Sequence, residues 1–166
     1  STLDRSSAAS DVYKRQWQDI WLNESFATYL TGLCYERLSP NLYWPIWRDN
    51  TMKRILSDSV NSVFVEDTTS VARIFSSTLS YYKGALMLHQ LKGQIGEDAF
   101  FQALKNYLND PKLKFKTARS KDMITHFENA CECDLSHYFD SWLFGVGYPS
   151  YTFTWSQQEG GVVGQM

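Results

Sequence analysis

Proline is absent from residues 46 to 110, and this long stretch constrains the fold more than any other feature. Because proline ends or kinks helices, its absence leaves room for several consecutive helices. Five of the nine glycines lie instead between Gly145 and Gly164, where they disfavour helix. We therefore expect a mainly α-helical chain whose last part, after Gly145, adopts another structure.

Apolar residues recur at helical spacing in several segments. The first helix is expected from Leu22, with Asn23 as its cap and Ser39-Pro40 as its end. Its apolar face would hold Leu22, Phe26, Tyr29, Leu30, Leu33 and Cys34. Further helices are expected over residues 43–60, 79–95 and 97–108, then from a cap at Ser120, and from a cap at Asp134 to about Phe144.

The end of the chain alternates apolar and polar residues. Tyr151, Phe153 and Trp155 alternate with three small polar residues, which is the period of a strand with one buried face. Since a single strand does not bury a face alone, we expect the first strand of a following β-domain in residues 149–166. Residues 17–148 would form the helical domain.

The first 16 residues differ from the rest in composition. They are rich in Ser and Ala and have no apolar period, so a disordered tail is one expectation. The other is that residues 11–16, Asp-Val-Tyr-Lys-Arg-Gln, are the translation of a sequencing adapter, which they resemble. In that case the segment 1–16 takes no part in the fold.

Charge and hydropathy exclude several classes of protein. The chain has 16 Lys and Arg against 18 Asp and Glu, and its pI of about 5.9 argues against a nucleic-acid or anionic-membrane binder. No uninterrupted apolar run approaches the roughly 18 residues of a membrane-spanning helix. Three cysteines cannot all pair within one chain, so we do not expect a disulfide framework.

Glu24 is the first candidate for chemistry. It lies in the first turn of its expected helix, on the side that also carries Thr28 and Thr31, where a metal or substrate could be met. A carboxylate in a first turn is also favoured by the helix dipole alone. A structural interpretation of Glu24 is therefore open as well.

Two tyrosines and a histidine in the helix over residues 79–95 are the next candidates. Tyr81 and Tyr82 stand at its start, where tyrosines usually pack their rings and leave the hydroxyl in water. His89 stands in its middle among leucines. We expect His89 to be a packed or rim residue and not a catalyst.

Cys131 and Cys133, with His126 and His137 nearby, supply four potential zinc ligands. All four fall within twelve residues, a tighter spacing than that of structural zinc sites. Two ordinary thiols at a turn between helices are the preferred interpretation.

Glu24 and Tyr81 belong to two motifs in a recognisable order. Residues 21–27 read Trp-Leu-Asn-Glu-Ser-Phe-Ala, and residues 81–84, which begin 57 residues after the glutamate, read Tyr-Tyr-Lys-Gly. They resemble the W-L-N-E-[GS]-F-A and Y-x-K-G patterns of the gluzincin zinc aminopeptidases, the aminopeptidase N (membrane alanine aminopeptidase) family. Residues 138–149 also look like that family's exit from its helical catalytic subdomain.

The resemblance implies a fold and two site residues. It covers about residues 17–155 and implies the multi-helix C-terminal subdomain of a thermolysin-like catalytic domain. In that family two histidines of H-E-x-x-H and a later glutamate hold zinc, and Glu24 matches that glutamate. Tyr81 matches the tyrosine whose phenol donates a hydrogen bond to the oxyanion of the tetrahedral intermediate. The implied substrate is a peptide that loses its N-terminal residue.

This chain departs from the family pattern in one respect. At the family's spacing, the residues of H-E-x-x-H would fall on Ser1, Thr2 and Arg5, none of which matches, and the G-x-M-E-N loop that holds the substrate's α-amino group is also missing. We therefore expect a fragment of a parent aminopeptidase, cut between Gln16 and Trp17. The parent would bind zinc, whereas this chain alone would not and would be inactive.

Two other functions remain open on the sequence. One is a non-catalytic helical protein-interaction module, and the other is a catalytically dead family member that serves as a binding protein. A peptidase requires Glu24 and Tyr81 to face one surface of the fold.

Overall fold

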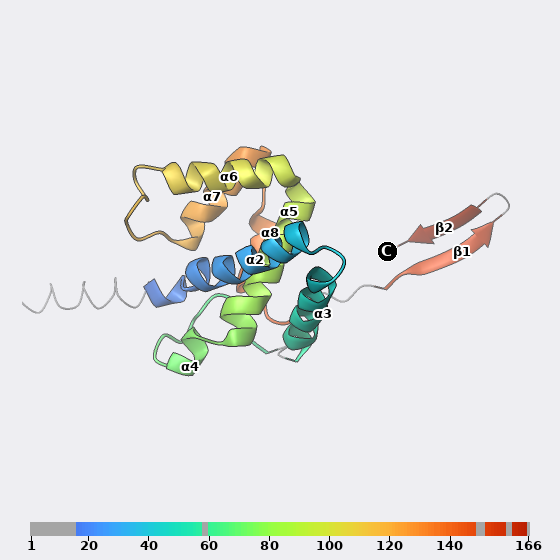
Figure 1. Ribbon diagram of the computed structural model, residues 1–166, viewed down its shortest axis with the longest axis horizontal. Coiled ribbons are helices and arrows are strands. Elements are labelled where there is room, and N and C mark those ends of the chain that lie inside the picture. The colour runs from blue at the N-terminus through green and yellow to red at the C-terminus, as the bar shows by residue number, and fades with distance from the viewer. Residues whose placement is uncertain (1–15, 58–59, 149–151, 159–160, 166) are drawn as a thin grey trace, which may run out of the picture.

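The computed structural model describes residues 16–57, 60–148, 152–158 and 161–165. Over these residues it consists of a helical body and a C-terminal β-hairpin (Figure 1). The elements are α2 (Trp21–Leu38), α3 (Tyr43–Leu56), α4 (Val71–Ile74), the π-helix η1 (Ser77–Lys83), α5 (Gly84–Ile95), α6 (Glu97–Asn109), α7 (Ser120–Cys131), α8 (Ser136–Phe139), the π-helix η2 (Asp140–Phe144), β1 (Thr154–Gln158) and β2 (Gly161–Gln165). The expected mainly α fold is confirmed.

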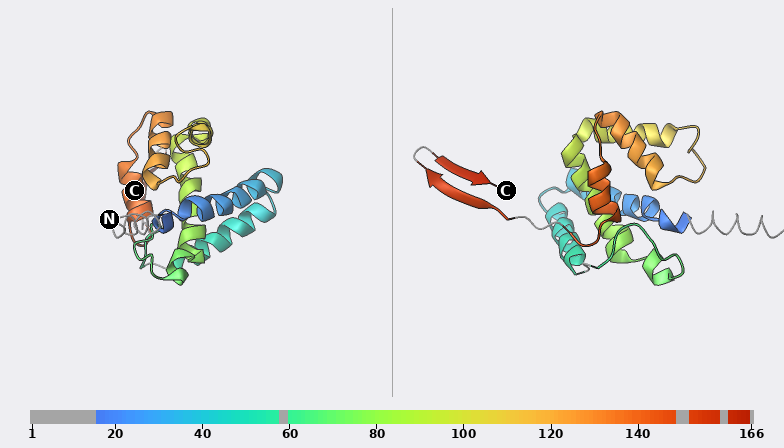
Figure 2. Two further views of the ribbon diagram at one scale, coloured as in Figure 1. Left: turned by 90° about the vertical axis from the view of Figure 1, so that its left-hand side faces the viewer. Right: turned by 180° about the vertical axis from the view of Figure 1, so that it is seen from behind.

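Helix α2 crosses the middle of the helical body, with α3 beside it (Figure 2, left). It ends at Ser39, as the following proline predicts. The prediction that Asn23 caps this helix is wrong, because the chain is already helical at Asn23, whose N–H donates to the Ile20 carbonyl at 2.9 Å. The helix begins at Trp21, and no side chain caps it.

The buried face of α2 also differs from the expected one. It consists of Trp21, Ser25, Tyr29 and Gly32. Leu30 is 50% exposed, and Cys34 is exposed too. The reason is close packing, because a Cβ on Gly32 would lie 2.5 Å from the Trp47 ring of α3. Small residues let the neighbouring helices approach, and two larger apolar residues are left outside.

The helix expected over residues 79–95 is two helices of different winding. η1 is π-helical, and α5 continues it directly from Gly84. Helix α5 contributes Ala85, Met87, Leu88 and Leu91 to the main apolar core. Its end at Gly96, which has φ of 87°, agrees with the expected break. The π-turn was not expected.

Helices α6 and α7 pack on each other through aromatic residues, chiefly Phe100 and Phe127, whose ring centroids lie 5.2 Å apart. Ser120 is not the cap of α7. The Arg119 N–H donates instead to the Asp122 carboxylate at 2.9 Å, which closes the first turn. The Ser120 hydroxyl accepts from the Trp21 indole N–H at 2.8 Å, so it joins α7 to α2.

The chain ends in two strands where one was expected. β1 and β2 pair antiparallel, with Trp155 opposite Gly164. The glycines of residues 160–164 hid the second strand from a periodicity argument. Phe153 and Trp155 are 63% and 65% exposed, so the expected buried face is not covered within the described residues.

Two further expectations concern the chain as a whole. The tail of residues 1–15 lies outside the described residues, as do residues 149–151 of the expected β-domain. Among the described helices, none has both the length and the apolar character needed to cross a membrane.

Candidate functional site

Glu24 lies in the first turn of α2 and is half-buried. It is next to the buried Ser25 but does not itself join the apolar core. The Thr28 hydroxyl donates to the Glu24 backbone carbonyl at 2.8 Å, which leaves the carboxylate out of that contact. The carboxylate is therefore available for another partner at the edge of the helix.

Tyr81 reaches this carboxylate from η1, which packs against α2. Partial burial raises the pKa of the Tyr81 phenol, and hydrogen bonding to the Glu24 carboxylate together with its negative charge raises the pKa further. The structure thus brings together the two residues that the motifs single out. The phenol is held in its protonated, donating form beside a carboxylate.

The neighbour of this phenol, Tyr82, has a different environment. The Arg54 guanidinium of α3 lies 4.6 Å from the centroid of its ring, an arrangement that favours a cation–π interaction. Tyr82 therefore packs against α3, while Tyr81 lies beside Glu24.

Lys83 of the same motif is completely buried. Its ammonium donates to the carbonyls of Asn61, at 3.2 Å, and Gly145, at 3.4 Å. These contacts tie η1 to the segment after α3 and to the end of η2. The sequence motifs assign no role to this lysine, although a charged residue inside a strong helical pattern is a signal that could have identified it.

His89 is half-buried and packs on Trp44, with the ring centroids 5.0 Å apart. Burial lowers the pKa of its imidazole, so the neutral form is favoured. This agrees with the expected packed or rim histidine.

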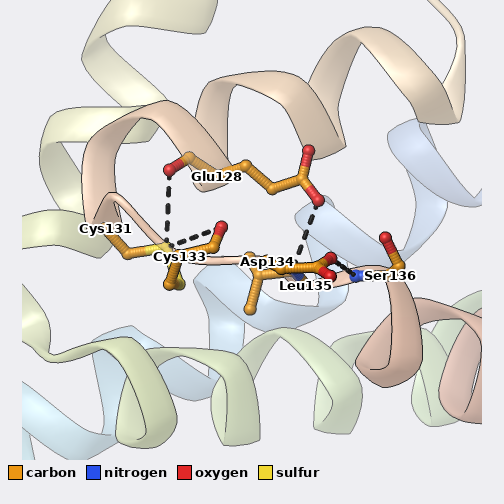
Figure 3. The surroundings of a disulfide bond; sticks show 6 residues. All are labelled: Glu128, Cys131, Cys133, Asp134, Leu135 and Ser136. Atoms are coloured by element: carbon orange, nitrogen blue, oxygen red, sulfur yellow. Dashed lines mark hydrogen bonds between the residues drawn. A yellow bond between two sulfur atoms is a disulfide. The ribbon is translucent and has the colours of Figure 1, made fainter.

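The cysteine–histidine group differs from the expectation of two thiols. Cys131 and Cys133 form a disulfide at the end of α7 (Figure 3). Glu132 between them adopts a left-handed conformation, with φ of 52°, and this turn brings the two side chains together. The thiol prediction failed because an odd cysteine count does not prevent two of three from pairing.

The two histidines near this disulfide have different surroundings. His126 faces Asp110, with Nε2 3.2 Å from the carboxylate oxygen. His137 lines a separate hollow of about 950 Å³ that is bounded by α5, α8 and η2 and that neither Glu24 nor Tyr81 lines. Among the described residues, no group of three His, Cys, Asp or Glu side chains is placed to hold a metal.

Zinc therefore does not fit the described residues by themselves. A catalytic zinc takes about three protein ligands and leaves a position for water or substrate. Around Glu24 the structure offers a single carboxylate and the Tyr81 phenol. The arrangement can supply one ligand and one hydrogen-bond donor, and nothing more of a metal centre.

Comparisons with known proteins match most of the chain to one family. Residues 10–142 match the Peptidase family M1 domain. The aminopeptidase N of Lactococcus lactis is 30% identical over 148 residues, which cover 83% of this chain and 17% of that protein. Probable aminopeptidase 1 of Sulfurisphaera tokodaii is 32% identical over 153 residues, which cover 85% of this chain and 18% of that protein.

A solved structure resembles the fold. It is a crystal structure of an M1 zinc metallopeptidase mutant from Deinococcus radiodurans, bound to a Tyr-Ser-Ala substrate. Its TM-score is 0.65 at 25% sequence identity, and the match covers 81% of this chain and 29% of that one. The chain thus spans less than a fifth of the length of the two curated relatives and under a third of the solved structure.

Proposed function

The chain belongs to peptidase family M1, and from that premise we propose that it is the part of a zinc aminopeptidase that supplies one metal ligand and one oxyanion donor. Glu24 would be the ligand and Tyr81 the donor. The observation that carries this proposal is that η1 packs against α2 and brings the Tyr81 phenol within hydrogen-bonding reach of the Glu24 carboxylate. The parent's substrate would be a peptide with a free N-terminus.

Tyr81 suits the stabilisation of an oxyanion. Its phenol keeps its proton at neutral pH, because burial and the Glu24 carboxylate both raise its pKa above the ordinary value near 10. A protonated phenol donates a hydrogen bond to the negative oxygen that develops when water attacks a peptide carbonyl. The proposed role of Glu24 is to place one negatively charged oxygen ligand at the metal, next to that donor.

The donor set also leads to a proposal about the chain by itself. Since one carboxylate is fewer than the roughly three protein ligands of a catalytic zinc, we expect no stoichiometric zinc and no hydrolysis by the 166-residue chain. The test is metal analysis of the purified chain after dialysis against zinc, together with a leucine p-nitroanilide assay. One bound zinc per chain, or release of nitroaniline, would contradict this part of the proposal.

The roles of the two residues need a protein that can complete the site. We therefore define an exchange enzyme as the Lactococcus lactis aminopeptidase N in which the matched segment is replaced by residues 17–142 of this chain. We expect it to bind zinc and to cleave leucine p-nitroanilide. Glu24→Ala should abolish zinc retention and activity, because a metal ligand is removed.

Glu66→Ala is the matched control, since Glu66 is an exposed carboxylate of the same segment. It should leave zinc content and rate unchanged. If the exchange enzyme binds zinc and remains fully active after Glu24→Ala, the proposed function is wrong. If it folds with zinc and is inactive with the wild-type segment, a non-catalytic helical module is the better description.

A further inference from the structure

A buried hydrogen bond joins α2 to η1 at the level of Glu24 and Tyr81. The side chain of Ser25 is fully buried, and its hydroxyl donates to the backbone carbonyl of Ser80 at 2.7 Å. Ser80 is fully buried as well. In a water-poor interior such a bond has a defined geometry, because neither partner has solvent as an alternative.

Gly84 makes room for this bond. A Cβ built on Gly84 would lie 1.9 Å from the Ser25 Oγ and 2.7 Å from the Ser25 Cβ. The serine side chain therefore occupies the space that the glycine leaves open at the junction of η1 and α5. Any larger residue at position 84 would push α2 away from η1.

The bond has a particular place in the sequence. Ser25 directly follows Glu24, and Ser80 directly precedes Tyr81. Consecutive Cα atoms are about 3.8 Å apart, so the bond fixes the two backbones within one residue of each proposed site residue.

The π-winding of η1 adds to this arrangement. The Gly84 N–H donates to the Leu79 carbonyl, five residues earlier, which is the π-helical spacing. Such turns are often found at functional sites, because they re-aim side chains that a regular α-helix would place elsewhere. Tyr81 stands within this turn, and the Ser25–Ser80 bond anchors the turn to α2.

We propose that Ser25 is a positioning residue whose hydroxyl, through the Ser80 carbonyl, holds the Tyr81 phenol at its place beside Glu24. The proposal rests on the roles proposed above for these two residues. Ser25 itself touches neither metal nor substrate. Its effect would appear in the transition state, where a displaced phenol donates poorly to the oxyanion, while substrate binding in the ground state is unaffected.

The first test uses the full 166-residue chain. All tyrosines are replaced by 3-fluorotyrosine, and the ¹⁹F resonance of Tyr81 is assigned by its loss in Tyr81→Phe. In the wild-type background, Glu24→Gln should shift this resonance. In Ser25→Ala the resonance should move, and its response to Glu24→Gln should shrink, because the phenol no longer stays beside residue 24.

Ser62→Ala is the matched control. The Ser62 hydroxyl donates to the Phe64 carbonyl at 2.7 Å, so this variant also loses one serine-to-carbonyl hydrogen bond, but on a different segment. It should leave the Tyr81 resonance and its response to Glu24→Gln in place. A folded Ser25→Ala chain with an unchanged Tyr81 resonance and an unchanged response would overturn the proposal.

The second test separates a positioning role from a purely structural one. In the exchange enzyme, Ser25→Ala should lower kcat about tenfold or more, with KM and zinc content unchanged, since small misplacements of a catalytic group have large effects on rate. Ser62→Ala should change none of the three. An unaltered kcat in Ser25→Ala, in an active exchange enzyme, would reject Ser25 and leave the proposed function intact.

The two tests also remain distinct if the proposed function fails. An exchange enzyme that binds zinc but is inactive with its wild-type segment would reject the proposed catalytic function. The fluorine experiment on the chain would still decide whether Ser25 holds Tyr81 beside Glu24.

Discussion

Two contacts in this protein hold helices together by different means. Between α6 and α7, large aromatic residues interlock, with Phe100 packing at 5.2 Å on Phe127 and at 5.6 Å on Tyr29 of α2. Between α2 and η1, the buried Ser25 hydroxyl donates to the Ser80 backbone carbonyl, and the Ser25 side chain occupies the space that Gly84 leaves open. The first contact contributes stability through buried apolar area. The second contributes little area and determines where Glu24 and Tyr81 lie.

The difference between the two contacts suggests a division of labour. An aromatic cluster tolerates small shifts, because apolar packing has no fixed direction. A buried hydrogen bond such as that between Ser25 and Ser80 does not tolerate such shifts, because its length and angle must stay within narrow limits. We therefore expect substitutions in the α6–α7 contact to change stability most, and substitutions in the α2–η1 contact to change geometry most.

The largest expected effect on stability is that of Phe127→Ala. Phe127 is fully buried and packs on Phe100, so truncation should lower the free energy of unfolding by about 3–5 kcal/mol. Urea denaturation followed by circular dichroism measures it. A decrease of less than about 1 kcal/mol would mean that the α6–α7 contact is not a main source of the stability of the fold.

A smaller effect is expected for Gly84→Ala, at the other contact. The new methyl would meet the Ser25 hydroxyl at 1.9 Å, so the free energy of unfolding should fall by about 1–3 kcal/mol. Gly93→Ala in the same helix is the control, since nothing lies within 4 Å of its added methyl. In that variant the free energy of unfolding should rise by about 0.5–1 kcal/mol, because alanine has the higher helix propensity. Equal effects in both variants would contradict the close packing of Ser25 on Gly84.

The smallest effects concern two buried phenols. The Tyr138 hydroxyl of α8 donates to the Met87 carbonyl at 2.6 Å, whereas no hydrogen-bond partner is found for the Tyr29 hydroxyl among the described residues. Tyr138→Phe should therefore lower the free energy of unfolding by about 1 kcal/mol at neutral pH. Tyr29→Phe should leave the free energy of unfolding unchanged in urea denaturation, because the hydroxyl that is lost has no hydrogen-bond partner among the described residues.

The same two phenols predict how stability depends on pH. Burial raises the pKa of both Tyr29 and Tyr138 above the ordinary value near 10. A raised pKa in the folded state gives stability that is present below about pH 10 and is lost as pH rises further, because the unfolded chain then binds fewer protons. Urea midpoints between pH 8 and pH 11 should fall at the alkaline end, and less steeply in each Phe variant. A flat profile in the wild type would contradict this.

The sequence predicted the helical class, most helix bounds and the pairing of Glu24 with Tyr81 by motif. These follow from signals that are local in the chain, such as apolar period, proline and glycine. The buried face of α2 was predicted only in part. Tyr29 is buried, and Leu22, Phe26 and Leu33 pack against the core, but the face also passes through Ser25 and Gly32 and leaves Leu30 and Cys34 exposed. Which face is buried depends on which neighbour can approach, and hydropathy does not encode that.

Other misses have similar physical causes. The Asn23 cap failed because the helix already begins at Trp21. The Ser120 cap failed because the Ser120 hydroxyl binds a longer-range partner, the Trp21 indole. The Cys131–Cys133 disulfide depends on the left-handed turn at Glu132, a conformation that no local pattern predicted. The π-winding of η1 was missed for the same reason, although it is what places Tyr81.

The most direct test of the central proposal compares two adjacent tyrosines in the exchange enzyme. Tyr81→Phe should lower kcat by about 10²–10³, the usual loss for one oxyanion donor, with zinc content and KM unchanged. Tyr82→Phe should leave kcat near the wild-type value, because Tyr82 uses its ring against Arg54. Equal rates for Tyr81→Phe and the wild type, or a larger loss for Tyr82→Phe, would contradict the assignment of Tyr81.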